Sequence, residues 1–359
     1  MKLLIVKLHA LGDLVIATPA IRRLSEGLEN VKIDLLTTSY SAPAVKGNPY
    51  VDNCIVIRDE LFFKPGLKTL LPTLRLILRL RKTRYDAAVI FHQHSMIRLF
   101  IRFMGISKRF SFDIDNTDDS VFLDDNRHSV LTALELADLA ISRLGGSIKP
   151  LPLLNDLKYE WYVQPEENQQ TEEILQRRFA NETKQSSIPL NFAVILPGGG
   201  VNPKAQDKVK RWPIENFIGL IEQITNNLKF KIVLLGGKSD REVAEIIVNK
   251  TNTQIINLCG ETDLRLSAAI MKNSRVVICN DSGPLHIAAA VGAPVVGIFG
   301  PTGVRHKLPP GKSSLAACLW LPCSPCYFSV FKGCIFDKIR CLEDLSVDDV
   351  MKVVYQVIH

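Results

Sequence analysis

The sequence lacks the patterns by which several large protein classes are recognised. No apolar run reaches the roughly 18 residues of a membrane-spanning helix. There is no Gly-x-Ser-x-Gly turn of a serine hydrolase and no His-Glu-x-x-His zinc motif. No Gly-x-Gly-x-x-Gly occurs in the right context, which argues against a nicotinamide-dependent oxidoreductase. Fixed-period repeats and low-complexity segments are also absent, so repeat and disordered architectures are not indicated.

Length and composition indicate two soluble globular domains. The chain has 359 residues, of which 47% are hydrophobic and 23% charged, enough for two cores. The net charge of +7 suits an anionic ligand or a membrane surface, and it is too small and dispersed to indicate nucleic acid. The N-terminus resembles the start of a signal peptide, but Lys7, His9 and Asp13 interrupt its apolar region. We therefore expect a cytoplasmic protein with reduced cysteines.

Strand and helix patterns alternate along the chain, which predicts an α/β protein with mainly parallel sheets. We expect strands at residues 2–7, 31–37, 54–57, 87–91, 192–196, 231–235, 255–258, 276–278 and 295–299. We expect helices at residues 14–28, 67–82, 97–104, 129–144, 171–179, 214–226, 240–249, 264–272, 284–291 and 346–358.

A proline-bearing, polar segment between about residues 150 and 187 divides the chain. We place an N-terminal Rossmann-like domain at residues 1–165 and a connection at 166–190. A second Rossmann-like domain is expected at residues 191–344, followed by a terminal helix at 345–359. The natural assembly of two such domains has a cleft between them.

One stretch in the second half has the features of an anion-binding turn. The apolar strand at residues 276–278 runs into Asn280-Asp281-Ser282-Gly283, and Pro284 suits the first turn of a short helix. Such a turn presents N–H groups and the positive end of a helix dipole at the carboxyl end of a strand. An ordinary strand–helix turn without a ligand is the alternative, with about equal weight.

Two more turns in the second half could meet a phosphorylated ligand. Gly198 and Gly199, in Leu196-Pro-Gly-Gly-Gly200, allow close approach of the backbone to a phosphate. Further on, Lys210 and Arg211 could reach phosphate oxygens at the same sheet edge, or form a solvated basic pair. Asp240, which ends Leu235-Gly-Gly-Lys-Ser-Asp240, is placed to accept hydrogen bonds from ribose hydroxyls.

In the first half, Leu8-His-Ala-Leu-Gly-Asp13 joins the first strand to the first helix. Asp13 could cap that helix or complement its dipole. Alternatively, it could face the cleft as a general base or a substrate ligand.

Two further features have open interpretations. Cys323, Cys326, Cys334 and Cys341 could together bind a structural zinc ion, although their spacing matches no common ribbon or finger. Free thiols are the favoured alternative and disulfides the third. The helix expected at residues 67–82 alternates Leu and Ile with Arg and Lys, so it could rest on the anionic inner leaflet or cover the core with a solvated basic face.

Taken together, four blocks of sequence, in the same order, resemble glycosyltransferase family 9, the ADP-heptose:lipopolysaccharide heptosyltransferases and their relatives. The blocks are residues 3–13 with 18–21, 196–200 with 210–213, 234–240, and 280–289 with 299–302. The resemblance implies a GT-B fold with the acceptor on the N-terminal half and the nucleotide-sugar on the C-terminal half. It also implies an inverting, metal-independent transfer to a lipopolysaccharide-type or other surface-glycan acceptor, with no cofactor required.

The resemblance also assigns roles to individual residues. Asp13 matches the catalytic base of the family, and Lys7 and Gly12 match its acceptor side. On the donor side, Lys210 matches a lysine that contacts phosphate and Asp240 an acidic residue at the ribose. The donor-phosphate turn is matched by Asp281, Ser282, Gly283 and His286.

The match leaves alternatives open, because Gly198-Gly-Gly200 and residues 201–209 depart from the hydroxyl-bearing turn of the heptosyltransferases. A family 9 transferase that uses another nucleotide-sugar in a different glycan pathway is the first alternative. A non-catalytic nucleotide-sugar-binding protein is the second. Asp13 and Lys210 together argue against it, since a binding protein needs no base.

Overall fold

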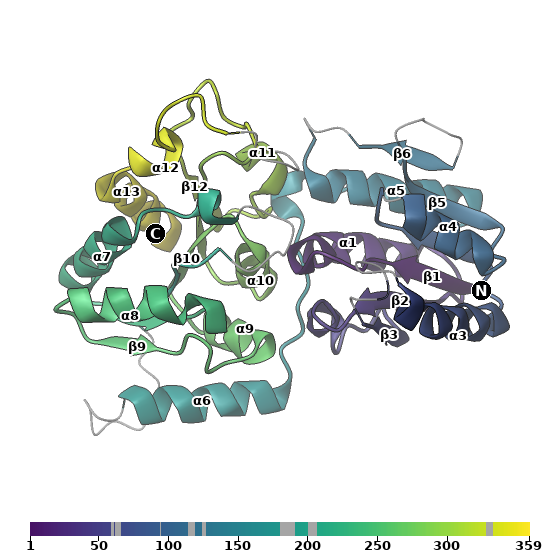
Figure 1. The fold of residues 1–359 in the computed structure, drawn as a ribbon, viewed down its shortest axis with the longest axis horizontal. Helices are drawn as coiled ribbons and strands as arrows, with labels where there is room; N and C mark the ends of the chain where they lie inside the picture. The colour runs from purple at the N-terminus through teal and green to yellow at the C-terminus, as the bar shows by residue number, and fades with distance from the viewer. Residues whose placement is uncertain are drawn as a thin grey trace. The chain divides into compact units, whose positions relative to one another are not determined.

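The structure is a computed structural model, and it describes residues 1–58, 61, 66–93, 95–113, 119–123, 127–179, 191–199, 207–327 and 333–359. The chain forms two compact units, which are coloured from purple to yellow along the sequence in Figure 1. Unit 1 comprises Met1–Leu154 and Glu160–Tyr162, and unit 2 comprises Asn155–Tyr159 and Val163–His359. The domain boundaries expected from composition stay a prediction. Among the described helices, none has the length and apolar character needed to cross a membrane.

Unit 1 is built on a parallel six-stranded sheet with the order β3-β2-β1-β4-β5-β6. Its strands are β1 Lys2–Val6, β2 Lys32–Thr38, β3 Asn53–Ile57, β4 Ala87–Ile90, β5 Lys108–Asp113 and β6 Ser120–Phe122. The central strands β1 and β4 are apolar and almost wholly buried, as in sheets covered on both faces. The strand order reverses between β1 and β4, and ligands of open α/β sheets bind at the carboxyl ends beside such a reversal.

Helices cover both faces of this sheet. They are α1 Leu11–Gly27, α3 Leu67–Thr83, α4 Ser95–Phe103 and α5 Ser129–Arg143. Leu4 and Val6 of β1 join one buried cluster with Leu80 of α3 and Phe100 of α4. Because successive side chains of a strand alternate, Leu3 points to the other face. There α5 contacts the neighbouring strands and packs along α1 (Figure 1).

The helix α1 begins at Leu11, three residues earlier than the pattern predicted, so Asp13 lies in its first turn. It also continues through Pro19, which has no N–H to donate to the carbonyl of Val15. The hydroxyl of Thr18 donates to that carbonyl at 2.7 Å and accepts from the Glu160 N–H at 2.9 Å. The side chain of Thr18 thus replaces the missing backbone hydrogen bond.

Unit 2 repeats the arrangement, with the parallel order β12-β11-β10-β7-β8-β9. Its strands are β7 Phe192–Leu196, β8 Lys231–Leu234, β9 Ile255–Asn257, β10 Val276–Asn280, β11 Val295–Ile298 and β12 Ser314–Ala317. Its helices are α6 Pro165–Phe179, α7 Ile214–Gln223, α8 Arg241–Lys250, α9 Leu264–Lys272, α10 Gly283–Ala290, α11 Val304–Lys307, α12 Arg340–Glu343 and α13 Val347–Ile358. The expected α/β class with parallel sheets is confirmed.

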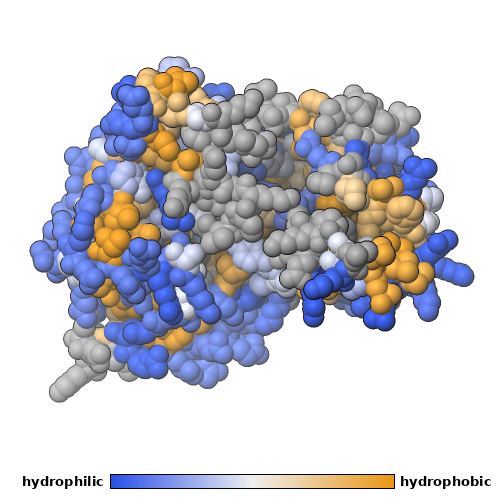
Figure 2. Space-filling model, viewed as in Figure 1, coloured by the Kyte–Doolittle hydropathy of each residue, from blue (hydrophilic) through white to orange (hydrophobic). Residues whose placement is uncertain are grey.

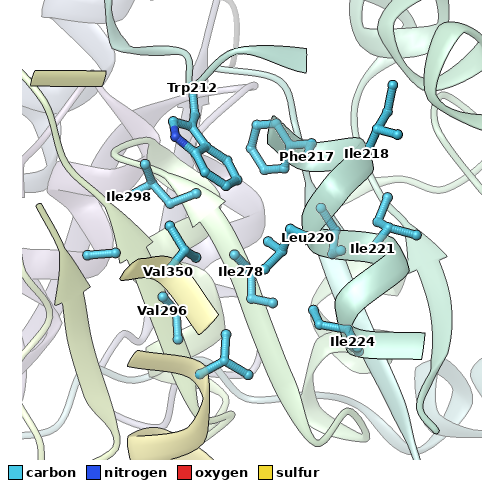
Figure 3. Packing of buried hydrophobic residues seen from close by; sticks show 14 of the residues in the cluster. Trp212, Phe217, Ile218, Leu220, Ile221, Ile224, Ile278, Val296, Ile298 and Val350 are labelled. Carbon is cyan, nitrogen blue, oxygen red and sulfur yellow. The ribbon is translucent and has the colours of Figure 1, made fainter. Parts of the chain in front are cut away.

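The core of unit 2 fixes the segment that precedes α7. Figure 3 shows Trp212 and Phe217 at one end of this core, above Ile278 and Ile298 of the sheet. The two aromatic rings meet edge to face with centroids 5.1 Å apart. The indole N–H of Trp212 donates to the carbonyl of Leu345 at 3.0 Å. Trp212 is therefore held by packing and by a hydrogen bond, and its neighbours in sequence are positioned with it.

Three outer strands were not expected, and one helix begins earlier than predicted. The strands β5, β6 and β12 lie toward the ends of their sheets, where burial is incomplete and apolar runs are short. The helix expected at residues 171–179 begins at Pro165 and packs on α9 within unit 2. Arg265 of α9 donates twice to the carboxylate of Glu167, and both side chains are buried.

Candidate functional site

In unit 2 the strand order reverses between β7 and β10, and a buried amide joins these two strand ends. Asn280, the last residue of β10, is fully buried. Its Nδ2 donates to the carbonyls of Pro197 at 3.1 Å and Gly198 at 2.9 Å. Its Oδ1 accepts from the N–H of Trp212 at 3.0 Å. Asn280 thereby connects the turn after β7, the Lys210 segment and the turn after β10.

Lys210 reaches this sheet edge because Trp212, two residues on, is anchored in the core. The Lys210 ammonium lies 3.8 Å from Oδ2 of Asp281 and 4.8 Å from the centre of the Tyr327 ring. Both Asp281 and Tyr327 are buried. A carboxylate and an aromatic face both attract a cation, so together they hold the Lys210 ammonium group in one position.

This geometry separates the roles of the residues in the anion-binding turn. The carboxylate of Asp281 would repel a phosphate, so its place beside Lys210 fits a residue that holds the lysine. The attraction for an anion comes from Lys210 itself and from the start of α10. There Ser282 is extended, with a φ of −153°, and the helix begins at Gly283. Backbone N–H groups of a first helical turn have no partner inside the helix and favour negative charge.

His286 lies inside unit 2, in α10, and is 4% exposed. Its ring centre is 5.9 Å from that of Tyr159, which is also buried. Asp281, Ser282, Gly283 and His286 thus follow the carboxyl end of β10, where the ammonium of Lys210 also lies. Their contact with a donor phosphate stays a prediction.

Asp240 occupies the space between two glycine turns. Its Oδ2 accepts from the N–H of Gly237 at 2.9 Å, and its Oδ1 lies 4.0 Å from the guanidinium of Arg211. A Cβ added to Gly198 would lie 2.2 Å from Oδ1, and one added to Gly236 would lie 2.9 Å from the Asp240 Cβ. The side chain of Asp240 is 6% exposed, so its carboxylate is buried between the turns after β7 and β8. Its contact with a ribose stays a prediction.

In unit 1 the strand order reverses between β1 and β4, and a side chain links the carboxyl ends of these two strands. The ammonium of Lys7 donates to the carbonyl of Phe91 at 3.1 Å and lies 3.5 Å from Oδ2 of Asp13. The Lys7 side chain is 9% exposed, whereas that of Asp13 is 43% exposed. Asp13 follows the buried Gly12 in the first turn of α1, where the helix dipole favours a carboxylate. A carboxylate that is solvent-accessible and ionised can accept a proton from a hydroxyl group.

His92, which lies just beyond β4, was not predicted as a site residue from the sequence. Its Nε2 accepts from the N–H of Leu8 at 2.7 Å, and its ring lies 4.9 Å from that of His9. This hydrogen bond places the proton of the neutral imidazole on Nδ1. A histidine just after a buried strand that neighbours the first strand was the signal available in the sequence. Tyr327 offered no such signal, because no pattern links it to Lys210.

The cysteines are all free thiols in the part of the chain that the structure describes. Burial, with smaller contributions from the other thiols of the cluster, raises the pKa of Cys326 and raises that of Cys341 to about 11. These directions favour the neutral thiol when no metal ion is bound; a metal ion would itself deprotonate a cysteine that it coordinates. Within the described residues, no three His, Cys, Asp or Glu side chains are grouped to hold a metal ion. The favoured interpretation as free thiols and the alternative of a structural zinc site both stay predictions.

Comparison with known proteins gives a consistent result. The family model of glycosyltransferase family 9 (heptosyltransferase) matches residues 73–339. The lipooligosaccharide heptosyltransferase 2 of Haemophilus ducreyi is 27% identical over 326 residues, which are 88% of each chain. The lipopolysaccharide heptosyltransferase 2 of Escherichia coli K12 is 25% identical over 314 residues, covering 84% of this chain and 83% of that protein.

Solved structures share the fold over the full length. E. coli ADP-heptose LPS heptosyltransferase II superposes with a TM-score of 0.74 at 21% identity, covering 100% of this chain and 98% of that chain. E. coli heptosyltransferase WaaC with ADP-2-deoxy-2-fluoro heptose gives 0.70 at 18% identity, covering 99% of both chains. The iron-containing glycosyltransferase TibC of enterotoxigenic E. coli gives 0.57 at 12% identity, covering 99% of this chain and 75% of that chain.

Proposed function

Because the chain belongs to glycosyltransferase family 9, we propose that it transfers heptose or a related sugar from ADP-heptose to a lipopolysaccharide core or a similar surface glycan. The proposed donor is supported by the solved WaaC structure with an ADP-heptose analogue, which shares this fold. The proposed acceptor is supported by relatives that are lipopolysaccharide and lipooligosaccharide heptosyltransferases. The observation that carries the proposal is the position of Lys210, 3.8 Å from Asp281 and beside the start of α10 at the strand reversal of unit 2.

On the donor side, negative charge grows on the diphosphate as its bond to the sugar breaks. Lys210 would meet that charge with its ammonium group, and the first N–H groups of α10 would meet it as hydrogen-bond donors. Asp281 and Tyr327 keep Lys210 in place, so little reorganisation is needed when the charge appears. In this mechanism these groups supply the stabilisation without a catalytic metal ion.

On the acceptor side, Asp13 would remove the proton from the attacking hydroxyl group. The oxygen then attacks the anomeric carbon from the face opposite the diphosphate, so that the configuration at that carbon inverts. One C–O bond forms, the C–O bond to phosphate breaks, and the nucleoside diphosphate leaves. Lys7, which stands 3.5 Å from Asp13, favours the ionised carboxylate before the reaction.

We further propose that the reaction takes place in the cytoplasm, at the inner face of the membrane where an anionic glycolipid acceptor is presented. The N-terminal unit carries the basic residues that such a surface attracts. This location is a proposal about partners and does not alter the chemistry assigned to Asp13 and Lys210.

A thermal-shift panel of nucleotide-sugars tests the donor. A ligand that binds only the folded protein raises the unfolding midpoint with its concentration. We expect ADP-heptose to raise the midpoint and UDP- and GDP-sugars to leave it unchanged. Lys210→Ala should lose most of the shift, while Lys250→Ala, which removes an exposed lysine paired with Glu215, should keep it.

Two outcomes separate the alternatives. Stabilisation by UDP- or GDP-sugars alone would replace heptose by another sugar and assign the chain to a different glycan pathway. Stabilisation by ADP-heptose without any transfer to acceptor, in the presence of an intact Asp13, would favour a nucleotide-sugar-binding protein.

A further inference from the structure

Two helices of unit 1 present large apolar side chains to solvent. On α3, Leu70, Leu71, Leu74 and Leu78 are 49–67% exposed. On α4, Met96, Leu99 and Phe103 are 45–60% exposed. Scattered exposed apolar residues are ordinary on a protein surface, but seven such residues on two helices form a patch that needs an explanation.

The exposed residues of α3 form a stripe separate from its buried face. Leu70, Leu74 and Leu78 recur every four residues, so they line one side of the helix. Leu80, on another side of the helix, is buried in the core cluster of unit 1 and makes a contact between α3 and the core. The stripe therefore does not belong to the core. An ordinary amphipathic helix, with its apolar side chains in the core and only basic residues outside, does not explain it.

Exposed basic residues run beside the leucine stripe. Lys68, Arg75, Arg79 and Lys82 are exposed and follow one another at spacings of seven, four and three residues. They form a second row along the same helix. A helix with an apolar stripe flanked by Lys and Arg is the pattern of an interfacial membrane helix.

The helix α4 extends the same surface. Met96, Leu99 and Phe103 recur at spacings of three and four residues, and Arg102 is exposed between them. Leu80 of α3 and Ile101 of α4 pack into one cluster, so the two helices lie on the same face of the sheet. Figure 2 shows orange side chains over α3 and α4 with blue ones at their border.

The charge of this region is concentrated and of one sign. Residues 61–112 contain eleven Lys and Arg residues and a single acidic residue, Asp86. Their net charge of +10 exceeds the +7 of the whole chain, so the rest of the chain is net negative. Neither α3 nor α4 contains an acidic residue. A second copy of this chain would bring two basic surfaces together, whereas an anionic surface complements them.

We propose that α3 and α4 form a docking surface for an anionic phospholipid bilayer. The seven apolar side chains enter the boundary between headgroups and acyl chains, and the surrounding Lys and Arg residues bind lipid phosphates. Neither step needs a nucleotide-sugar or a glycan acceptor. The surface can therefore be tested separately from the sugar-transfer activity.

Vesicle sedimentation tests this surface. The full-length protein should sediment with vesicles of phosphatidylethanolamine and phosphatidylglycerol, sediment less at high salt, and remain in solution with phosphatidylcholine alone. Leu70→Ser/Leu74→Ser should lower the partition coefficient about tenfold or more, because it removes apolar groups that enter the bilayer. Arg75→Glu/Arg79→Glu should lower it by a similar factor through reversed charge.

A matched control distinguishes this surface from exposed leucines in general. Leu151 and Leu153 belong to unit 1, lie outside both helices, and are 39% and 76% exposed. Leu151→Ser/Leu153→Ser should bind vesicles as the unchanged protein does. All variants should keep their unfolding midpoint and the shift produced by ADP-heptose, which shows that they are folded and that the donor site is intact.

Three results would overturn the proposal. The first is an unchanged protein that fails to bind anionic vesicles. The second is undiminished binding by both Leu70→Ser/Leu74→Ser and Arg75→Glu/Arg79→Glu. The third is a dimer in lipid-free solution that Leu70→Ser/Leu74→Ser dissociates, because a second copy of the chain would then be the partner of this surface.

Discussion

The carboxylate of Asp240 occupies the space that a side chain at position 198 would need. A Cβ added to Gly198 would lie 2.2 Å from Oδ1 and 2.4 Å from Cγ of Asp240, far inside contact distance. The nearest atoms to that added Cβ all belong to Asp240. Glycine at this position therefore allows the turn after β7 and the carboxylate after β8 to share one sheet edge.

Gly198→Ala should destabilise the protein by about 1–3 kcal/mol, because overpacking displaces a buried side chain and its turn. The same displacement should weaken the binding of ADP. Thermal unfolding and nucleotide titration measure the two effects. Gly237→Ala is the matched control in the neighbouring turn, since its nearest contact would be 3.8 Å and its φ is −76°. If Gly198→Ala/Asp240→Ala were no more stable than Gly198→Ala alone, a clash with the Asp240 carboxylate would not be the cause of the lost stability.

Tyr327 should act as a positioning residue for Lys210. Tyr327→Leu removes the aromatic face 4.8 Å from the ammonium, so we expect the KM for the donor to rise about 3- to 30-fold with a smaller change in kcat. Tyr327→Phe keeps the ring and should restore the original KM. Phe179→Leu removes a comparable cation–π contact, to Lys231, away from this strand end and should leave the KM unchanged. Equal losses in Tyr327→Phe and Tyr327→Leu would contradict the positioning role.

The Arg22–Glu160 pair predicts a pH-dependent stability. Burial raises the pKa of Glu160, and Arg22, whose guanidinium lies 2.8 Å from its carboxylate, partly offsets that rise. A carboxyl group with a raised folded pKa favours folding at low pH, and this contribution is lost as the pH rises through the folded pKa. Arg22→Met raises the folded pKa further.

We therefore expect Arg22→Met to cost about 1–2 kcal/mol near pH 8 and clearly less near pH 5. Denaturant unfolding at the two pH values measures this difference. In Arg22→Met/Glu160→Gln the buried charge is gone, so the pH dependence of the loss should disappear. A loss of the same size at both pH values would show that Glu160 stays ionised throughout.

The C-terminal cysteines should remain thiols in the reduced protein. Burial disfavours the thiolate forms of Cys326 and Cys341, and it raises the pKa of Cys341 to about 11. We expect thiol titration after denaturation to count eight free cysteines and a chelator to leave the unfolding midpoint unchanged. One equivalent of bound zinc or iron, together with a midpoint lowered by the chelator, would instead support a structural metal held by Cys323, Cys326, Cys334 and Cys341.

The sequence predicts the turns at the carboxyl ends of the central strands in both units, because their local chemistry is distinctive. A buried apolar strand such as β10 leads into a polar, glycine-containing turn, and both features can be recognised without knowledge of the fold. The position of Asp13 at the carboxyl end of β1 follows in the same way. Strands β5 and β6 could not be found, since β5 begins with Lys108 and Arg109 and neither strand forms a buried apolar run.

Contacts between residues that are distant in sequence could not be predicted from sequence patterns. Tyr327 and Lys210 lie far apart in sequence, and only the packing of unit 2 brings the ring to the ammonium. Asp240 was expected to point at a ribose, but the depth of its carboxylate between Gly198 and Gly236 depends on how two neighbouring turns meet. The start of α1 was misplaced by three residues because the sequence offers no capping side chain at Ala10.

Sugar transfer measured with ADP-heptose and a heptose-deficient lipopolysaccharide acceptor tests the central claim most directly. We predict that the unchanged protein adds heptose and releases ADP. Asp13→Asn should retain ADP-heptose binding but lose turnover by roughly 10²–10⁴-fold, because the general base is removed. Transfer by Asp13→Asn at the unchanged rate, or no transfer from ADP-heptose by the unchanged protein, would contradict the account.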